Sequence, residues 1–152
     1  MQKKDRETAP GAAWETVEGS LYGVLSLVTP EGAPDGVPLN FWRMGKDLYF
    51  HTARQGEKTR CLKNNSAVSI AFVREAGLSP ERLTTLYSSA VVTGEAEEVT
   101  GPDERKACLR ALCRHSGVRE DHPALRTDFS GCFGETAVWR IRVREITGKA
   151  QH

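Results

Sequence analysis

The clearest hydrophobic pattern of the chain lies near its C-terminus, in residues 137–144. Every second residue there is apolar, and arginine fills most of the positions between them. A period of two places the two sets on opposite faces of a β-strand. The segment is therefore predicted to be a half-buried strand with a basic face turned to solvent.

Strand patterns also fill the first half of the chain. Strands are predicted over residues 20–28, 36–44 and 48–52, each rich in apolar side chains. Turn signals separate them at residues 30–32 (Pro-Glu-Gly) and 45–47 (Gly-Lys-Asp). The first half is therefore expected to be an antiparallel meander.

Two further strands are predicted in the second half. One covers residues 67–74, and a longer β-prone stretch covers residues 84–99. Residues 75–82 between them are predicted to be a loop. Gly94 interrupts the longer stretch, which indicates a bulge or a close approach of two backbones.

Helical patterns are few and mostly short. Residues 8–18 are predicted to form an amphipathic helix that ends at Gly19, and residues 55–62 one or two helical turns. The strongest helix pattern covers residues 103–115, where a proline precedes two acidic residues at the helix start. Residues 117–134 carry no clear pattern.

About six strands and one substantial late helix predict a mainly β protein. We expect a six-stranded antiparallel split barrel with a few flanking helices, in a single domain over residues 1–152. The order is not a βαβ alternation, and the chain contains neither G-x-G-x-x-G nor G-x-x-x-x-G-K-[ST]. Rossmann and P-loop folds are therefore excluded.

Charge and hydropathy narrow the environment of the protein. The 21 basic and 20 acidic residues give a net charge of +1, which does not favour nucleic acid as a partner. No apolar run reaches the length of a membrane span, and the first ten residues lack the apolar stretch of a secretion signal. We therefore expect a cytoplasmic protein with no membrane partner.

Four cysteines raise the question of a metal or a disulfide. Cys61, Cys108, Cys113 and Cys132 contain no C-x-x-C pair and are expected to be free thiols. Cys108, Cys113 and His115 could converge on a metal, but their spacings of five and two do not match a zinc knuckle. Packing of a helix is the expected role, and no metal is expected.

Residues that suit a phosphate gather where the third strand ends. That strand would deliver His51 and Thr52, and a short helix would begin near Gly56 with Lys58 in its first turn. Free N–H groups at a helix start, a lysine and a hydroxyl together suit a phosphate monoester. The alternative is that Lys58 is a solvated charge and Thr52 merely a β-prone residue.

Four motifs then follow one another in order. They are G-V-P-L-N at 36–40, Y-F-H-T-A-x-x-G-x-K at 49–58, T-T-x-Y-x-S at 84–89 and E-I-T-G-K-A at 145–150. This order resembles the Nim-type nitroimidazole-resistance proteins, within the superfamily of pyridoxamine-phosphate-oxidase-like split β-barrels. The similarity extends from about residue 22 to residue 150.

The resemblance implies a homodimer of six-stranded split barrels with two FMN sites at the subunit interface. It implies that residues 38–40 line the flavin ring through backbone groups, that Thr52 and Lys58 hold the phosphate, and that Ser89 reaches the flavin. His51 would lie beside the ring. The cofactor-binding set expected from the resemblance is Pro38, Leu39, Asn40, His51, Thr52, Ala53, Lys58, Ser88 and Ser89.

Two departures from the oxidases of that superfamily affect the expected activity. Glu57 and Phe41 stand where the oxidases carry basic residues, so phosphate affinity would be weaker or supplied by Arg54 or Arg60. The C-terminal segment also lacks their Arg-x-His substrate motif. Oxidation of pyridoxamine phosphate is therefore disfavoured.

The leading hypothesis is an FMN-dependent reductase. Electrons from a reduced nicotinamide or a protein donor would reach a small organic acceptor, with nitro-aromatics as one class considered. His51 would be the catalytic residue that protonates the acceptor, or it only packs at the strand end. A flavin storage or sensing module is the alternative, and a haem-binding barrel with His51 or His115 as the axial ligand is the third.

Overall fold

The computed structural model describes residues 3–152, so residues 1 and 2 of the predicted domain lie outside the described part. Its strands are β1 (Glu7–Thr8), β2 (Gly23–Val28), β3 (Pro34–Leu39), β4 (Trp42–Met44), β5 (Asp47–Ala53), β6 (Ala67–Ser79), β7 (Thr84–Glu98) and β8 (Thr136–Gln151). Its helices are η1 (Lys4–Arg6), α1 (Pro10–Gly19), α2 (Glu57–Asn64), α3 (Pro102–His115), η2 (Pro123–Arg126) and α4 (Ser130–Phe133).

All eight strands form one antiparallel sheet that curls into an incomplete barrel. Its order is β3-β2-β6-β7-β8-β5-β4, with β1 paired to β8. The end strands β3 and β4 are separated in the chain only by Asn40 and Phe41. The two ends of the sheet must therefore meet in space, although no ladder joins them. Because β4 covers only the first three residues of β5, the rest of β5 faces β3 without a hydrogen-bonded ladder, and we call this boundary between β3 and β5 the seam.

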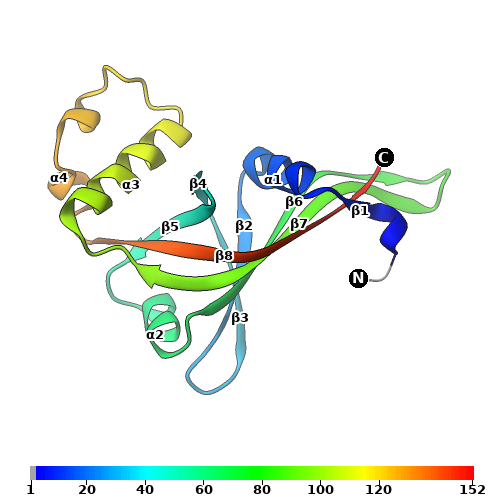
Figure 1. Ribbon diagram of the computed structural model, residues 1–152, viewed down its shortest axis with the longest axis horizontal. Coiled ribbons are helices and arrows are strands. Elements are labelled where there is room, and N and C mark those ends of the chain that lie inside the picture. Colours follow the sequence, from blue (N-terminus) through cyan, green and yellow to red (C-terminus); the bar gives the residue numbers. More distant parts are fainter. Residues whose placement is uncertain (1–2) are drawn as a thin grey trace.

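The main core fills the inside of the barrel. Its fully buried members include Leu25, Phe50, Ile70, Val92 and Ile141, one from each of β2, β5, β6, β7 and β8. They occupy alternate positions of their strands, as a half-buried strand requires. Helix α2 adds Cys61 and Leu62 to this core and covers one end of the barrel (Figure 1).

A helical lobe made of α3, η2 and α4 covers the outer face of β5 and β8 (Figure 1). Tyr49 and Val138 point outward from the strands and pack with Leu109 of α3 and with Phe129, which directly precedes α4. On β5 the neighbours Leu48 and Phe50 belong to the main core instead. The same alternation thus sends successive side chains of β5 to two different cores.

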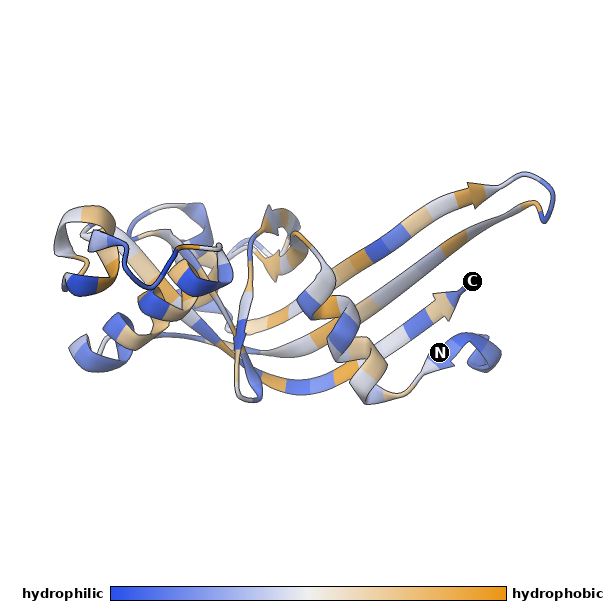
Figure 2. Ribbon diagram, turned by 90° about the horizontal axis from the view of Figure 1, so that it is seen from above, coloured by the Kyte–Doolittle hydropathy of each residue, from blue (hydrophilic) through white to orange (hydrophobic). Residues whose placement is uncertain are grey.

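Strands β6 and β7 extend beyond the barrel as an arm (Figures 1 and 2). The ladder is interrupted between Arg74 and Gly77 and then resumes as far as Ser79 and Thr84. The loop predicted over residues 75–82 is therefore wrong for most of its length, because the strand continues past this irregularity. At the tip, Leu83 is 93% exposed.

The mainly β barrel class is confirmed, but the number and course of the strands differ in detail. There are eight strands rather than six, because the two-residue β1 and the three-residue β4 add to the six longer ones. The strand predicted over 36–44 is two strands at opposite ends of the sheet. This division also interrupts the expected meander, since β3 pairs with β2 and β4 with β5.

The bulge expected at Gly94 is present. The register of β7 against β8 shifts between Thr93 and Gly94. A Cβ on Gly94 would collide with the carbonyl oxygen of Arg142 on β8. Glycine is therefore needed here for the close approach of the two backbones.

None of the helices within residues 3–152 is both long and apolar enough to cross a membrane.

Candidate functional site

Two strand edges without a partner flank the seam. Strand β3 is the last strand of the sheet, so the edge that faces away from β2 has no ladder. Strand β5 pairs with β4 only from Asp47 to Tyr49, which leaves residues 50–53 unpaired on that side. Main-chain donors and acceptors are thus available on both sides of the seam.

Six of the nine residues expected to bind a cofactor lie along these two edges or at their ends. Pro38 and Leu39 end β3, and Asn40 follows at the point where the chain crosses to β4. Phe41 follows Asn40 and packs edge to face against Phe50, the neighbour of His51, with the ring centroids 5.7 Å apart. The two motifs that are nine residues apart in the sequence therefore meet across the seam.

His51 and Thr52 point to opposite faces of β5. His51 follows Tyr49 by two residues and shares its outward direction, whereas Thr52 shares the inward direction of Phe50. Ala53, exposed at the end of the strand, again points outward. One ligand group therefore cannot contact both His51 and Thr52 from the same face of the strand.

Aromatic rings enclose the imidazole of His51. Its ring centroid lies 6.2 Å from Trp42 and 6.2 Å from Phe133, which meets it edge to face. Its Nδ1 is buried and has no hydrogen-bond partner within residues 3–152. Burial lowers the pKa of His51 below its ordinary value. The side chain is therefore neutral at pH 7 and has an unused polar atom.

The start of α2 lies directly beyond the end of β5. Gly56 precedes the helix with φ 140°, a conformation that favours glycine. The hydroxyl of Thr59 donates to the carbonyl of Ala53 at 3.2 Å and fixes the first turn of α2 to the strand. Lys58 is half-buried in this turn and forms no ion pair within the described part of the chain.

Arg60 does not supply a free charge at this helix start. Its guanidinium bridges Glu57 at 2.7 Å and Glu31 at 2.9 Å. The hydrogen bonds from Arg60 lower the pKa of both carboxyl groups, so both are ionised at neutral pH. Of the two arginines expected to compensate for Glu57, only Arg54 is left without an ion pair among the described residues.

The two serines of β7 face different sides of the sheet. Ser88 is 8% exposed and lies with its hydroxyl 3.4 Å from His152, in a cavity under α1. Ser89 lies on the outer face, where it lines a cavity of about 360 Å³ with Val91 and Lys149. The expectation that both serines hold one cofactor stays a prediction, with their side chains on opposite faces of the sheet.

Ser89 also lies away from the seam of its own chain. One rung of paired residues crosses the outer face through Pro38, Val24, Ala71, Val91 and Thr147. Strand β7 is thus three strand steps from β3, about 14 Å, and two strand steps from β5, about 10 Å, at the usual spacing of strands. Ser89 therefore does not line the seam of its own chain.

The sequence did not assign roles to two residues beside Ser89. Thr147 and Lys149 line the same cavity because β8 continues to Gln151, well past the predicted strand. They belong to the E-I-T-G-K-A motif at 145–150, so the sequence did contain a signal that singles out these two residues. We call the outer surface formed by Ala71, Val73, Ser89, Val91, Thr147 and Lys149 the open face.

The remaining candidates lie elsewhere. His115 is exposed at the end of α3, beside a cavity of about 300 Å³ that Phe41 and Leu48 also line. Cys108 and Cys113 are buried in the helical lobe. Within residues 3–152 no group of three or more histidine, cysteine or acidic side chains could hold a metal.

Comparison with known proteins gives a family. The family described as pyridoxamine 5'-phosphate oxidase matches residues 10–150 of this chain. No curated protein matches this chain.

Several solved structures share the fold. A candidate 5-nitroimidazole antibiotic resistance protein from Bacteroides thetaiotaomicron has a TM-score of 0.75 and 24% identity, over 93% of this chain and 83% of that one. An FAD-binding protein from Mesorhizobium loti has a TM-score of 0.71 and 20% identity, over 97% of this chain and 98% of that one. An FAD and heme binding protein from Mycobacterium smegmatis has a TM-score of 0.76 and 16% identity, over 97% of this chain and 74% of that one.

Proposed function

Because this chain belongs to the pyridoxamine 5'-phosphate oxidase family, we propose that it binds a flavin, FMN, along the seam and uses it as a reductase. One observation carries the proposal: two unpaired strand edges converge on a helix start whose lysine has no ion pair within residues 3–152. The FAD-binding structures of the same fold support a flavin as the ligand.

The residues at the seam fit a flavin at both of its ends. A planar ring with alternating donors and acceptors can exchange hydrogen bonds with the main chain of residues 38–40, as an added strand would. The orphaned Nδ1 of His51 offers one more polar contact. At the other end, Lys58, Thr52 and the first turn of α2 suit a single phosphate.

In this proposal the flavin supplies the redox chemistry, taking electrons from a nicotinamide or protein donor and passing them to a small organic acceptor. His51 stays neutral at pH 7 because burial lowers its pKa. In this proposal it therefore donates an N–H hydrogen bond to the acceptor, and the proton that the acceptor takes up moves through this hydrogen bond. The acceptor proposed is a nitro-aromatic, the class that the Bacteroides protein of the same fold names.

A homodimer is part of the same proposal. Ser89 lies on β7, three strand steps from β3 and two from β5, so one chain offers two half-sites that a second copy could complete. The open face also exposes Val73 and Val91, which are 58% and 40% accessible. Burial of this surface against an identical copy would remove apolar area from water. Four free cysteines agree with the cytoplasm that the sequence favours.

The flavin site is tested with two lysines of the same helix. Lys58→Ala is expected to weaken FMN binding about tenfold, because one charge-assisted hydrogen bond to phosphate is lost. Lys63→Ala changes an exposed lysine in the last turn of α2 and should leave the affinity within about twofold. Equilibrium dialysis of FMN against each variant gives the dissociation constants.

Riboflavin separates the two ends of the site. It lacks the phosphate, so its affinity should be the same for the wild type and for Lys58→Ala. If Lys58→Ala weakens riboflavin and FMN equally, Lys58 does not hold the phosphate. Turnover of a nitro-aromatic by the FMN-loaded protein with reduced nicotinamide then tests the reductase, and no turnover with any donor would favour a storage or sensing module.

A further inference from the structure

A second polar cavity lies beyond the end of β5. It measures about 170 Å³ and is bounded by β5, β7, α3 and β8. Its polar lining consists of Arg54, Glu98, Thr100, Arg105 and Thr136. None of these residues contributes to the seam.

This cavity adjoins the phosphate end of the proposed flavin site. Ala53 pairs with Thr136 of β8, which lines the cavity. The carbonyl of Ala53 accepts the Thr59 hydroxyl from α2, and the next residue, Arg54, donates its N–H to Glu135. The first turn of α2 and the cavity are therefore attached to two consecutive residues of the backbone.

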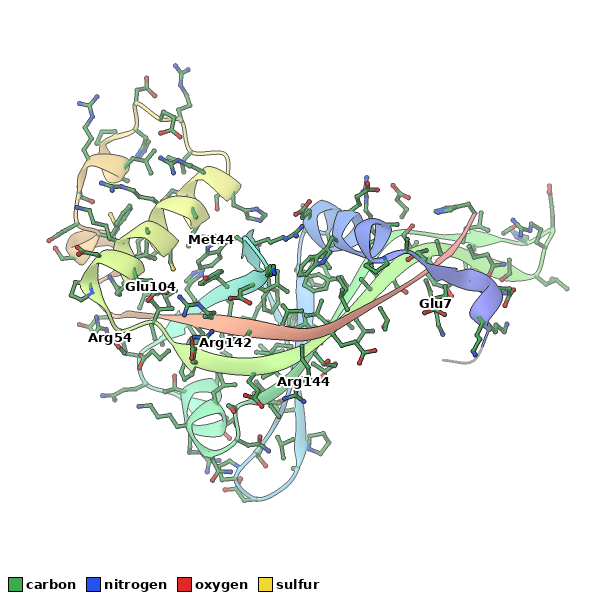
Figure 3. All side chains as sticks on the ribbon, in the orientation of Figure 1. Glu7, Met44, Arg54, Glu104, Arg142 and Arg144 are labelled. Atoms are coloured by element: carbon green, nitrogen blue, oxygen red, sulfur yellow. The ribbon has the colours of Figure 1, made fainter. Side chains whose placement is uncertain are left out.

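The cavity carries more positive than negative charge. Arg105 is held in place because its guanidinium donates to the carbonyl of Thr136 at 2.8 Å and to that of Phe133. Arg54 is exposed and lies near the start of β8 (Figure 3). It has no ion pair within residues 3–152. Glu98 contributes one carboxylate to the lining.

Two guanidinium groups and two threonine hydroxyls provide several donors for an oxyanion. Guanidinium groups bind phosphate oxygens strongly and in fixed directions. A single phosphate group fits the volume of this cavity, whereas an adenosine does not, so the remainder of a longer ligand would extend into solvent.

We propose that this cavity receives the second phosphate of a flavin dinucleotide whose first phosphate lies at Lys58. This inference rests on the proposed function, since it places the dinucleotide's ring along the seam. FMN has no second phosphate to occupy this cavity. The dinucleotide FAD gains contacts there and binds more tightly than FMN.

Calorimetric titration of riboflavin, FMN and FAD into the wild-type protein and three variants tests the proposal. FAD is expected to bind about tenfold tighter than FMN to the wild type, the effect of one additional charge-assisted contact. Arg54→Ala should weaken FAD binding more than FMN binding and so remove this advantage. Glu98→Gln should increase the advantage, because it removes the carboxylate that opposes a phosphate.

Arg119→Ala is the matched control. Arg119 is an exposed arginine in the segment after α3, paired with Asp121, and its loss should change no flavin affinity. Equal binding of FMN and FAD, or an Arg54→Ala variant that weakens both flavins alike, would overturn the second phosphate site while the flavin site stands. A protein that binds none of the three flavins would overturn the proposed function and this inference with it.

Discussion

At the scale of single residues, His51 is one of the side chains with a buried polar atom that lacks a hydrogen-bond partner among the described residues. It lies between Trp42 and Phe133, and its buried Nδ1 has no partner within the described residues. A polar atom buried without a hydrogen bond costs free energy, and such exceptions are found at functional sites. The orphaned atom is therefore expected to be satisfied when a ligand lies at the seam.

The lowered pKa of His51 makes part of the stability depend on pH. The unfolded chain binds a proton at the ordinary pKa of 6.5, whereas the folded chain does so only at lower pH. Between these two values the unfolded state holds more protons, so the stability due to His51 falls as the pH decreases. It is fully present above pH 6.5.

His51→Gln removes this dependence because glutamine does not titrate. As the pH is lowered from 7.5 to 5.5, the urea midpoint of the wild type should therefore fall relative to that of His51→Gln. Denaturation curves at several pH values measure it. A difference that stays constant over this interval would mean that the imidazole is solvated in the folded protein.

The cysteines give a second prediction for single residues. Cys132 is exposed, whereas Cys61, Cys108 and Cys113 are buried, and burial raises the pKa of these three thiols. A chromogenic aromatic disulfide should therefore react rapidly with one thiol in the native protein and with four in denaturant. Cys132→Ser should leave no rapidly reacting thiol, and rapid reaction of a second thiol would show that the helical lobe opens.

At the scale of elements, two glycines decide how the barrel is packed. Gly94 permits the bulge that brings β7 against β8, and Gly148 permits the approach of α1, since a Cβ there would lie 2.8 Å from the Cβ of Ala13. Both contacts involve backbone or a short side chain that cannot move aside. Space for a methyl group is therefore missing at both positions.

Gly94→Ala is expected to destabilise the protein by about 1–3 kcal/mol, because the added methyl group collides with the Arg142 carbonyl. Gly11→Ala is the control: nothing lies within 4 Å of its added Cβ, and α1 should gain about 0.5–1 kcal/mol. Urea denaturation measures both. Equal stability of the two variants would contradict the bulge.

The sequence predicted the elements better than their arrangement. Alternation identified β8, and β-prone residue types identified the long β7, since both signals depend only on local sequence. It did not separate β3 from β4, because Asn40 and Phe41 carry no turn signal and the change of partner strand depends on closure of the barrel. The faces of Ser88 and Ser89 likewise required the register of β7, which the motif alone does not contain.

At the scale of the whole molecule, the open face is the surface that a second copy would cover. Glu145 and Lys149 lie on this side of β8, on either side of Thr147. A two-fold axis through Thr147 would bring Lys149 of one copy against Glu145 of the other. Such self-complementarity is what an isologous interface needs.

Val91→Glu should therefore break the proposed dimer. It would place one carboxylate from each copy near the two-fold axis, where the two charges would be buried without partners. Leu21→Glu is the matched control, since Leu21 is 89% exposed but lies in the loop before β2. Light scattering coupled to size exclusion should give a monomer for the first variant and a dimer for the second. A wild type that is monomeric at every concentration would contradict the shared site.

The central claim is that the seam binds a flavin, and the visible spectrum of the freshly purified protein tests it most directly. We predict the absorption bands of a bound flavin, released on denaturation and identified by mass, or FMN that stays with the initially colourless protein when unbound FMN is removed. A Soret band would instead indicate haem. A protein that stays colourless and binds neither FMN nor FAD would contradict the account.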